Sequence, residues 1–245
     1  MLDSIKKAFV LMPKALKLFY VLTGIAVVMN LINLLVIPAP VDTEMSLGRS
    51  FAVIGLTAVF AVIGLFIYGG ALAYIKELIK SGSGNIASFL DNSKKYFLRI
   101  LGITALVFLI FLILSVLSVI IVGVMPNVIK VIISIIMVLA FITLSILFVM
   151  PGYAAVGSDL GVVESIRKGV LVGKKNFLAI LLMMLIIFAI AIAVIGVTSL
   201  ITGLTALISR PLSGFVSALL MAAANSAMTI LIGTAFMDLY FKKSE

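Results

Sequence analysis

The chain has 245 residues, of which 64% are hydrophobic and only 11% are charged, and its net charge is +9. Soluble domains carry about 25% charged residues, and a core of this length cannot bury so much apolar surface, so the composition predicts an integral membrane protein. Basic chains can bind nucleic acid, but here Lys and Arg flank apolar segments, which is typical of membrane topology, and we expect no nucleic-acid partner. The absence of Cys and His excludes disulfides, thiolate nucleophiles and the usual side chain for proton transfer and metal binding.

Six apolar segments have the roughly 20 residues needed to cross about 30 Å of hydrocarbon. No polar stretch is long enough for a second domain, so we expect one all-α membrane domain over residues 1–245. The fold class is a polytopic helical bundle. The predicted spans are Leu18–Ile37, Phe51–Ile75, Phe97–Val124, Val128–Met150, Phe177–Ile208 and Leu212–Tyr240.

The first segment is interpreted as a retained span and not as a signal peptide. Leu18–Ile37 is 20 residues long, whereas the apolar region of a signal peptide has about 7–15 residues, and no A-x-A-like cleavage site follows it.

The distribution of Lys and Arg predicts the orientation. Fifteen of these residues lie before the first span, in the two even-numbered connections or in the C-terminal tail, and three (Arg49, Lys130 and Arg210) lie on the other side. By the positive-inside rule both termini are expected in the cytoplasm, with the chain in the plasma membrane.

Short sequence matches predict an internal repeat. Ser4–Leu11 is similar to Ser165–Val172 at an offset of 161 residues, and Lys94–Leu101 is similar to Lys174–Leu181 at an offset of 80. The repeat divides the chain into three tandem hairpin units at about 1–80, 81–157 and 158–245. Because all three start on the inner side, the repeats are parallel, which argues against the inverted-repeat transporter folds.

Each unit is expected to begin with an amphipathic helix lying on the cytoplasmic surface. Val163, Ile166 and Val170 recur at helical spacing among basic residues. Pro13 and Gly173 are expected to let the chain bend from the membrane plane into the next span. Such helices place cations near anionic headgroups, so the candidate contacts to anionic lipid or to a partner protein are Lys6, Lys7, Lys94, Lys95, Arg167, Lys168, Lys174 and Lys175.

The fifth segment is longer than one crossing requires. Phe177–Ile208 has 32 residues, or about 48 Å of straight helix. We expect the helix to break near Gly196 or Gly203, so that Thr198–Ser209 form a re-entrant or interfacial piece.

Few polar groups enter the predicted membrane interior, and none near a span centre is ionisable. Asn30 and Asn33 share a face of the first span, and Asn225 and Ser226 lie near the middle of the sixth. Either these four side chains line a cavity for a lipid headgroup or a small polar solute, or they form hydrogen bonds between helices.

Small residues also recur along the sixth span, where Ala218, Ala222 and Ser226 form one row and Ala223 and Ala227 another. Small residues allow close helix approach, and the rows would serve packing within the bundle or a homo-oligomer seam.

Charged residues occur at the inner ends of the spans. Glu77 lies beside Lys76, and Asp238 lies near Lys242. Ion pairing at the interface is the expected role of these residues.

The pattern Met150-Pro151, Asp159–Gly169 and Lys175–Phe177 resembles the membrane domain attached to some glycerophosphodiester phosphodiesterases and standalone six-span relatives from prokaryotes. The resemblance implies a six-helix membrane module. It does not imply the phosphodiesterase reaction, which belongs to a separate soluble domain of those proteins.

No nucleophile paired with a base, no phosphate loop and no metal motif occurs in the sequence. We therefore expect a protein that is not an enzyme and has no cofactor: an accessory or scaffold subunit acting at the cytoplasmic face with anionic lipid or with a partner such as a lipid enzyme, an ATPase or a transporter. The alternative is a permease or lipid-handling transporter with a cavity between the first and sixth spans.

Overall fold

The computed structural model describes residues 1–36, 47–124 and 126–244, and all regular secondary structure in these ranges is helical. The expectation of an all-α fold is therefore confirmed. The elements are α1 (Leu2–Leu11), the 3₁₀ turn η1 (Met12–Ala15), α2 (Leu16–Val36), α3 (Leu47–Ser81), α4 (Phe89–Val124), α5 (Asn127–Gly157), α6 (Val162–Lys175), α7 (Phe177–Ile208) and α8 (Arg210–Lys243).

Six membrane-spanning candidates occur in the described part of the chain, as predicted, so the protein is a polytopic membrane protein. Five of the long helices have 31 to 36 residues, more than the roughly 20 that a straight crossing needs. The extra length lies partly in polar segments: α3 continues to Ser81, α4 begins at Phe89 and α5 continues to Gly157.

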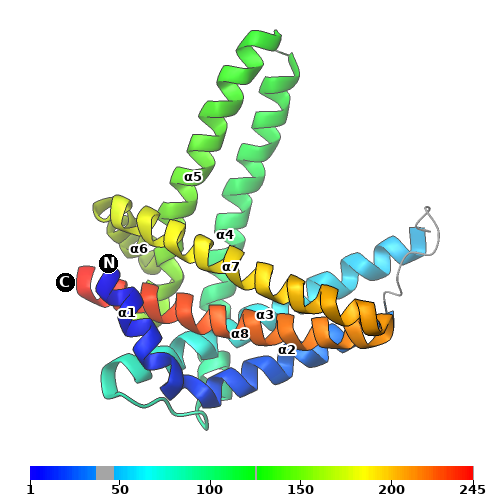
Figure 1. Ribbon diagram of the computed structural model, residues 1–245. Coiled ribbons are helices and arrows are strands. Elements are labelled where there is room, and N and C mark those ends of the chain that lie inside the picture. The colour runs from blue at the N-terminus through cyan, green and yellow to red at the C-terminus, as the bar shows by residue number, and fades with distance from the viewer. Residues whose placement is uncertain (37–46, 125, 245) are drawn as a thin grey trace.

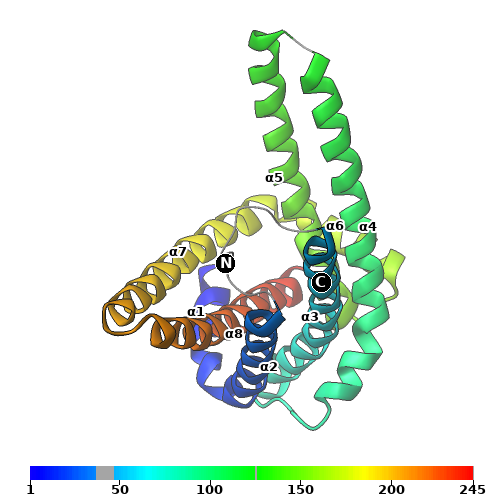
Figure 2. The same cartoon turned by 90° about the vertical axis from the view of Figure 1, so that its right-hand side faces the viewer.

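Both termini lie at one end of the molecule, which we call the basal end (Figure 1). The long helices leave this end in two groups. The hairpin of α4 and α5 diverges from α2, α3, α7 and α8 in both views (Figures 1 and 2). The halves of the long helices away from the basal end are called the distal halves.

The packed core lies at the basal end. In α3 the buried apolar residues fall within 71–78, in α5 within 146–156 and in α8, apart from Ala222, within 230–240. The distal halves are exposed along their apolar side chains, as at Phe51 in α3 and Ile135 in α5. In a bilayer these exposed side chains contact acyl chains, which are as apolar as they are.

Two of the three expected inner helices are separate elements, namely α1 and α6. The third expectation was wrong, because Lys94 and Lys95 lie within the first turns of α4, which continues without interruption into the span. No Pro or Gly separates these lysines from Gly102, and the backbone hydrogen bonds therefore run on.

The expected bend at Pro13 is present, since η1 joins α1 to α2 there. The expected bend at Gly173 was wrong: this residue is buried inside α6, and α6 ends at Lys175. A Cβ at Gly173 would lie 3.1 Å from the Leu147 carbonyl oxygen, so the glycine allows α6 to approach α5 closely.

The expected break in the fifth segment was also wrong, because α7 is one continuous helix from Phe177 to Ile208. In lipid no water competes for the backbone hydrogen bonds, so a lone glycine does not end a helix. The hydroxyls of Thr198 and Thr202 bond back to carbonyls of the preceding turn, and a tilted crossing accommodates the length.

Candidate functional site

A similar helix packing occurs three times at the basal end. The helix α1 packs on α8, the start of α4 packs on α3, and α6 packs on α5. Each basic segment thus lies against the end of a membrane helix, and together the three contacts connect the three hairpins.

One fully buried serine lies in each of these segments: Ser4, Ser93 and Ser165. The Ser93 and Ser165 hydroxyls have no hydrogen-bond partner among the described residues, which indicates that small size is what these positions require. At the α3–α4 contact, a Cβ added to Gly70 would overlap the Ser93 Oγ. At the α5–α6 contact, a Cβ added to Gly169 would overlap the Pro151 nitrogen. Side chains any larger would separate the helices.

In the first basic pair, Lys7 binds the protein itself and Lys6 is exposed. The Lys7 Nζ lies 2.8 Å from the Asp238 Oδ1, and the other carboxylate oxygen lies 2.6 Å from the Lys242 Nζ. The Asp238 side chain is only 3% exposed, so a buried charge ties α1 to α8, while Lys6 is exposed. The expected pairing of Asp238 with Lys242 is confirmed.

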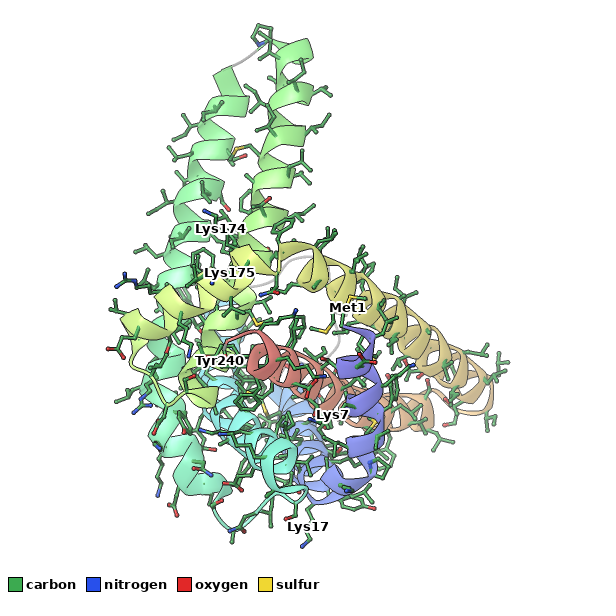
Figure 3. All side chains as sticks on the ribbon, turned by 90° about the vertical axis from the view of Figure 1, so that its left-hand side faces the viewer. Met1, Lys7, Lys17, Lys174, Lys175 and Tyr240 are labelled. Atoms are coloured by element: carbon green, nitrogen blue, oxygen red, sulfur yellow. The ribbon has the colours of Figure 1, made fainter. Side chains whose placement is uncertain are left out.

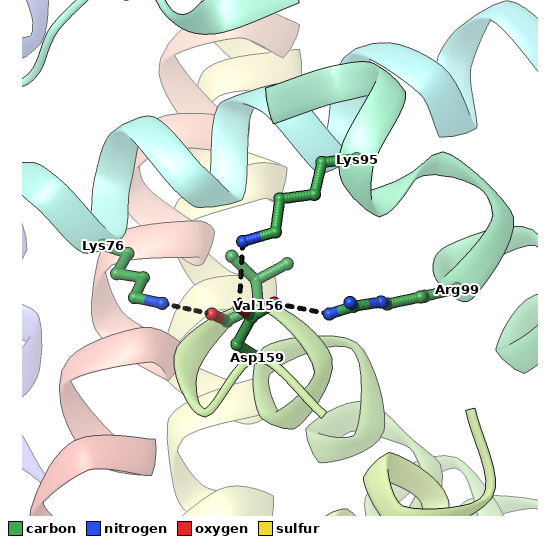
Figure 4. A network of polar contacts seen from close by, with 5 residues as sticks. All are labelled: Lys76, Lys95, Arg99, Val156 and Asp159. Carbon is green, nitrogen blue, oxygen red and sulfur yellow. Dashed lines mark hydrogen bonds and ion pairs between the residues drawn. The ribbon is translucent and has the colours of Figure 1, made fainter. Parts of the chain in front are cut away.

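The second pair behaves in the same way. The Lys95 Nζ lies 2.8 Å from one carboxylate oxygen of Asp159, and the Arg99 guanidinium donates a hydrogen bond to the other oxygen (Figure 4). Beside them the Lys76 Nζ donates to the Val156 carbonyl at 2.7 Å and connects α3 to α5. Hydrogen bonds from Lys95 and Arg99 lower the pKa of the Asp159 carboxyl from 3.8 to about 2. Lys94 is exposed.

In the third pair Lys168 faces the protein and Arg167 is exposed. The Lys168 Nζ donates to the Ser158 hydroxyl at 3.2 Å and lies 5.8 Å from the centre of the Tyr240 ring. The Ser158 and Tyr240 hydroxyls are 2.7 Å apart. This network connects α6 and the end of α5 to α8.

The predicted basic contacts therefore fall into two classes. Lys7, Lys95 and Lys168 bind the protein itself and hold the basal end together. Apart from Lys95 and Lys242, the exposed cations are in no ion pair within the described ranges; they are Lys6, Lys14, Lys17, Lys80, Lys94, Arg167, Lys174, Lys175 and Lys243. We call the three exposed members of the basic pairs, Lys6 of α1, Lys94 of α4 and Arg167 of α6, the basic platform.

The predicted polar residues of the spans are only partly brought together. The Asn30 side chain donates to the Ala218 carbonyl at 3.3 Å and so bridges α2 and α8. Asn33 is exposed. Asn225 and Ser226 line a pocket of about 200 Å³ between α2, α3 and α8, together with Tyr68, Thr229 and apolar residues.

The small-residue row Ala218, Ala222 and Ser226 serves packing within the chain. Ala222 and Ser226 are buried, and Asn30 of α2 bonds at Ala218. A homo-oligomer seam on α8 would therefore have to use the row of Ala223 and Ala227, which is only partly buried.

Several basal contacts were not predicted from the sequence, above all those of Asp159, Ser158 and Tyr240. Sequence spacing carries no signal for the contacts of Asp159 with Arg99 and of Ser158 with Tyr240, because these join residues 60 and 82 positions apart. The expectation for Glu77 was wrong: its carboxylate accepts a hydrogen bond from the Asn85 backbone N–H at 3.0 Å, because the chain turns back over the end of α3.

No family model, curated protein or solved structure matches the chain. The resemblance to the membrane domain of glycerophosphodiester phosphodiesterases therefore stays a prediction. The function has to be argued from the geometry of the basal end and of the apolar surfaces.

Proposed function

We propose that the chain is a non-enzymatic accessory or scaffold subunit of the plasma membrane, whose basal end faces the cytoplasm and binds anionic lipid headgroups or a partner protein through the basic platform. The observation that supports it most strongly is the division within the three basic pairs. One member of each pair binds the protein, and the other is exposed without an ion pair in the described part of the chain.

The packing of the basal end supports a scaffold. The salt bridges of Asp159 and of the buried Asp238, together with close helix contacts, tie the hairpins together there, so the exposed cations project from a well-packed core. A cation near an anionic membrane surface contributes about 1 kcal/mol, so three such cations at the basal end would favour anionic lipid by about 3 kcal/mol.

The distribution of charge supports the orientation. The fifteen Lys and Arg residues assigned to the inner side lie in the segments that form the basal end. Enzymatic labelling of a tag at either terminus in inverted and right-side-out vesicles tests this: labelling from the cytoplasmic side only is expected.

Lipid analysis tests the headgroup proposal. The protein is extracted with a styrene–maleic acid copolymer, and its anionic lipids are quantified for the wild type and for Lys6→Gln/Lys94→Gln/Arg167→Gln. We expect the variant to lose most of its enrichment in anionic lipid over the bulk membrane. The control, Lys130→Gln, removes a cation from the distal end and should leave the enrichment unchanged. Unchanged enrichment in the triple variant would exclude the platform as a lipid-binding surface, and crosslinking at the same positions would then test for a protein partner.

The transporter alternative has one supporting observation, the pocket that contains Asn225 and Ser226. The Ser226 hydroxyl already donates to the Ala222 carbonyl at 2.8 Å, and Asn30 and Asn33 are not among the lining residues. Only two of the four predicted polar side chains line the pocket. The geometry therefore supports binding at the basic platform better than a path for a solute through the bundle.

A further inference from the structure

A second feature of the molecule, separate from the basic platform, is an apolar groove between the diverging hairpins. It lies where α5 faces α7 and α8 and has a volume of about 800 Å³, within the range of ligand-binding pockets. Its lining is apolar apart from Ser145, whose hydroxyl donates to the Phe141 carbonyl at 2.8 Å. Representative lining residues are Ile146 and Val149 of α5, Leu181 and Phe188 of α7, and Met228 and Phe236 of α8.

Two adjacent cations, Lys174 and Lys175, follow Gly173, which packs on α5 beside the groove residue Ile146. Lys174 and Lys175 form the end of α6, where the chain passes into α7 beside α5 (Figure 3). Their position follows from the packing of Gly173, whose added Cβ would lie 3.2 Å from the Leu147 Cα, next to the groove residue Ile146. Both lysines are exposed, and within the described ranges neither is in an ion pair.

The surroundings determine what occupies such a groove. Five of the long helices have more residues than a straight crossing needs, so both hairpins can cross the membrane at a tilt and leave a wedge between them. Acyl chains fill an apolar wedge in a bilayer, and moving a chain from lipid into it provides little selectivity, because both environments are apolar. Selectivity therefore has to come from the headgroup, and the two exposed lysines that follow Gly173 favour a phosphate that carries net negative charge.

We propose that the groove binds one anionic membrane phospholipid, with its acyl chains between α5 and the α7–α8 hairpin and its phosphate between Lys174 and Lys175. The inference rests on the proposed function in taking the basal end as the cytoplasmic membrane surface. It goes beyond that function by assigning a discrete lipid site with residues that the basic platform does not include.

The lack of tryptophan in the chain allows a direct test by fluorescence quenching. Phe188→Trp places a single fluorophore in the groove, and Phe108→Trp places one on the lipid-exposed surface of α4. The two phenylalanines are matched, with exposures of 64% and 66%. Each variant is reconstituted in phosphatidylcholine vesicles with increasing amounts of dibrominated phosphatidylglycerol or dibrominated phosphatidylcholine, whose bromines quench on contact.

We expect the fluorophore of Phe188→Trp to be quenched by the anionic lipid at a roughly tenfold lower mole fraction than by the zwitterionic lipid. The fluorophore of Phe108→Trp should respond equally to both lipids. Adding Lys174→Gln/Lys175→Gln to Phe188→Trp should remove the preference, and because both lysines are exposed these changes should leave the elution volume of the protein unchanged.

Equal quenching of Phe188→Trp by the two lipids would overturn the site, as would a preference that survives the double lysine change. The outcome is separable from the proposed function, because Lys6→Gln/Lys94→Gln/Arg167→Gln in the Phe188→Trp protein should keep the preference. If that triple change removes the anionic-lipid enrichment while Phe188→Trp shows no lipid preference, the platform is supported and the groove is excluded. The converse result would support the groove and exclude the platform.

Discussion

The basal and distal halves of the long helices both contain apolar stretches, but these stretches lie in opposite environments. In α3, residues 71–78 are largely buried, whereas Phe51, Ile54 and Val59 are exposed by more than half of their surface. The ion pairs found among the described residues, at Asp159 and Asp238, all lie basally. Protein contacts thus hold the basal half together, and the distal half depends on lipid.

This difference shows that hydropathy alone does not locate the folded core of a membrane protein. Six helices are apolar enough to span, but the hydrophobic effect does not drive helices together inside lipid. Close packing and polar contacts do so, and these occur where small residues and charges accompany the apolar ones. Substitutions in the basal half should therefore be costly, and matched substitutions in the distal half should not.

The largest effect is expected from Gly169→Val. Its Cβ would overlap the backbone nitrogen of Pro151 and would lie 2.7 Å from the Pro151 Cδ, so α6 would have to move away from α5 at a cost of about 3 kcal/mol. In an unfolding titration with SDS, monitored by circular dichroism, the midpoint should shift to a lower SDS mole fraction than in the wild type.

The matched control is Gly196→Val in the distal half of α7, where no atom of another helix in the described part of the chain lies within 4 Å of the added Cβ. This change should alter the free energy of unfolding by less than about 1 kcal/mol, the scale of helix propensities. Equal losses of stability at the two positions would contradict the division into two halves.

A smaller loss is expected from Asp238→Asn. The carboxylate is 3% exposed and pairs with Lys7 and Lys242, and removing its charge leaves the partly buried Lys7 ammonium without its partner. Because Lys7 is 39% exposed, water compensates in part, and we expect a loss of about 2 kcal/mol in the SDS assay. Asp3→Asn, at an exposed carboxylate of α1, is the control and should cost less than about 0.5 kcal/mol. A loss for Asp238→Asn no larger than that would show that the pair does not hold α1 on α8.

The spans could be predicted from the sequence because about 20 consecutive apolar residues have no other stable environment. The division between halves could not, because it depends on which helices meet. Gly70 and Gly169 occur in apolar or amphipathic stretches like Gly196 and Gly203, and only the packed structure shows that the first two contact neighbouring helices. For the same reason a break was wrongly expected in α7.

The Asp159 carboxylate should contribute still less to the free energy of unfolding, and its contribution should depend on pH. Its pKa is lowered from 3.8 to about 2 by Lys95 and Arg99, so the native state favours the ionised carboxylate. The resulting stability is present above about pH 4 and is lost as the pH falls towards about 2. Because the side chain is 45% exposed, solvent screening limits the contribution to less than about 1 kcal/mol.

The measurement compares the wild type with Asp159→Asn between about pH 6 and about pH 2. The wild type should be the more stable protein above about pH 4, and the difference should disappear by about pH 2. A difference that grew on acidification would have the wrong sign for a carboxylate stabilised by cations.

The candidate site was predictable in part. The basic pairs stand out in the sequence because they precede spans, but helical phase alone did not distinguish the member that binds the protein. That distinction required partners such as Asp159 and Tyr240, which lie far away in the chain. Amide side chains were similarly ambiguous: Asn30 and Asn33 share a face, yet only Asn30 lies within hydrogen-bond distance of a carbonyl of α8.

The smallest effect is expected from Asn30→Leu in the distal half. It removes one hydrogen bond of 3.3 Å to the Ala218 carbonyl, and interhelical hydrogen bonds in membranes contribute about 0.6 kcal/mol on average. Asn33→Leu is matched in composition, helix and depth, but its side chain is exposed, so the SDS assay should show no loss for it. A loss for Asn30→Leu as large as that for Asp238→Asn would mean that a polar contact contributes as much in the distal half as in the basal half. In that case protein contacts, and not lipid alone, would stabilise the distal half of the α2–α8 contact.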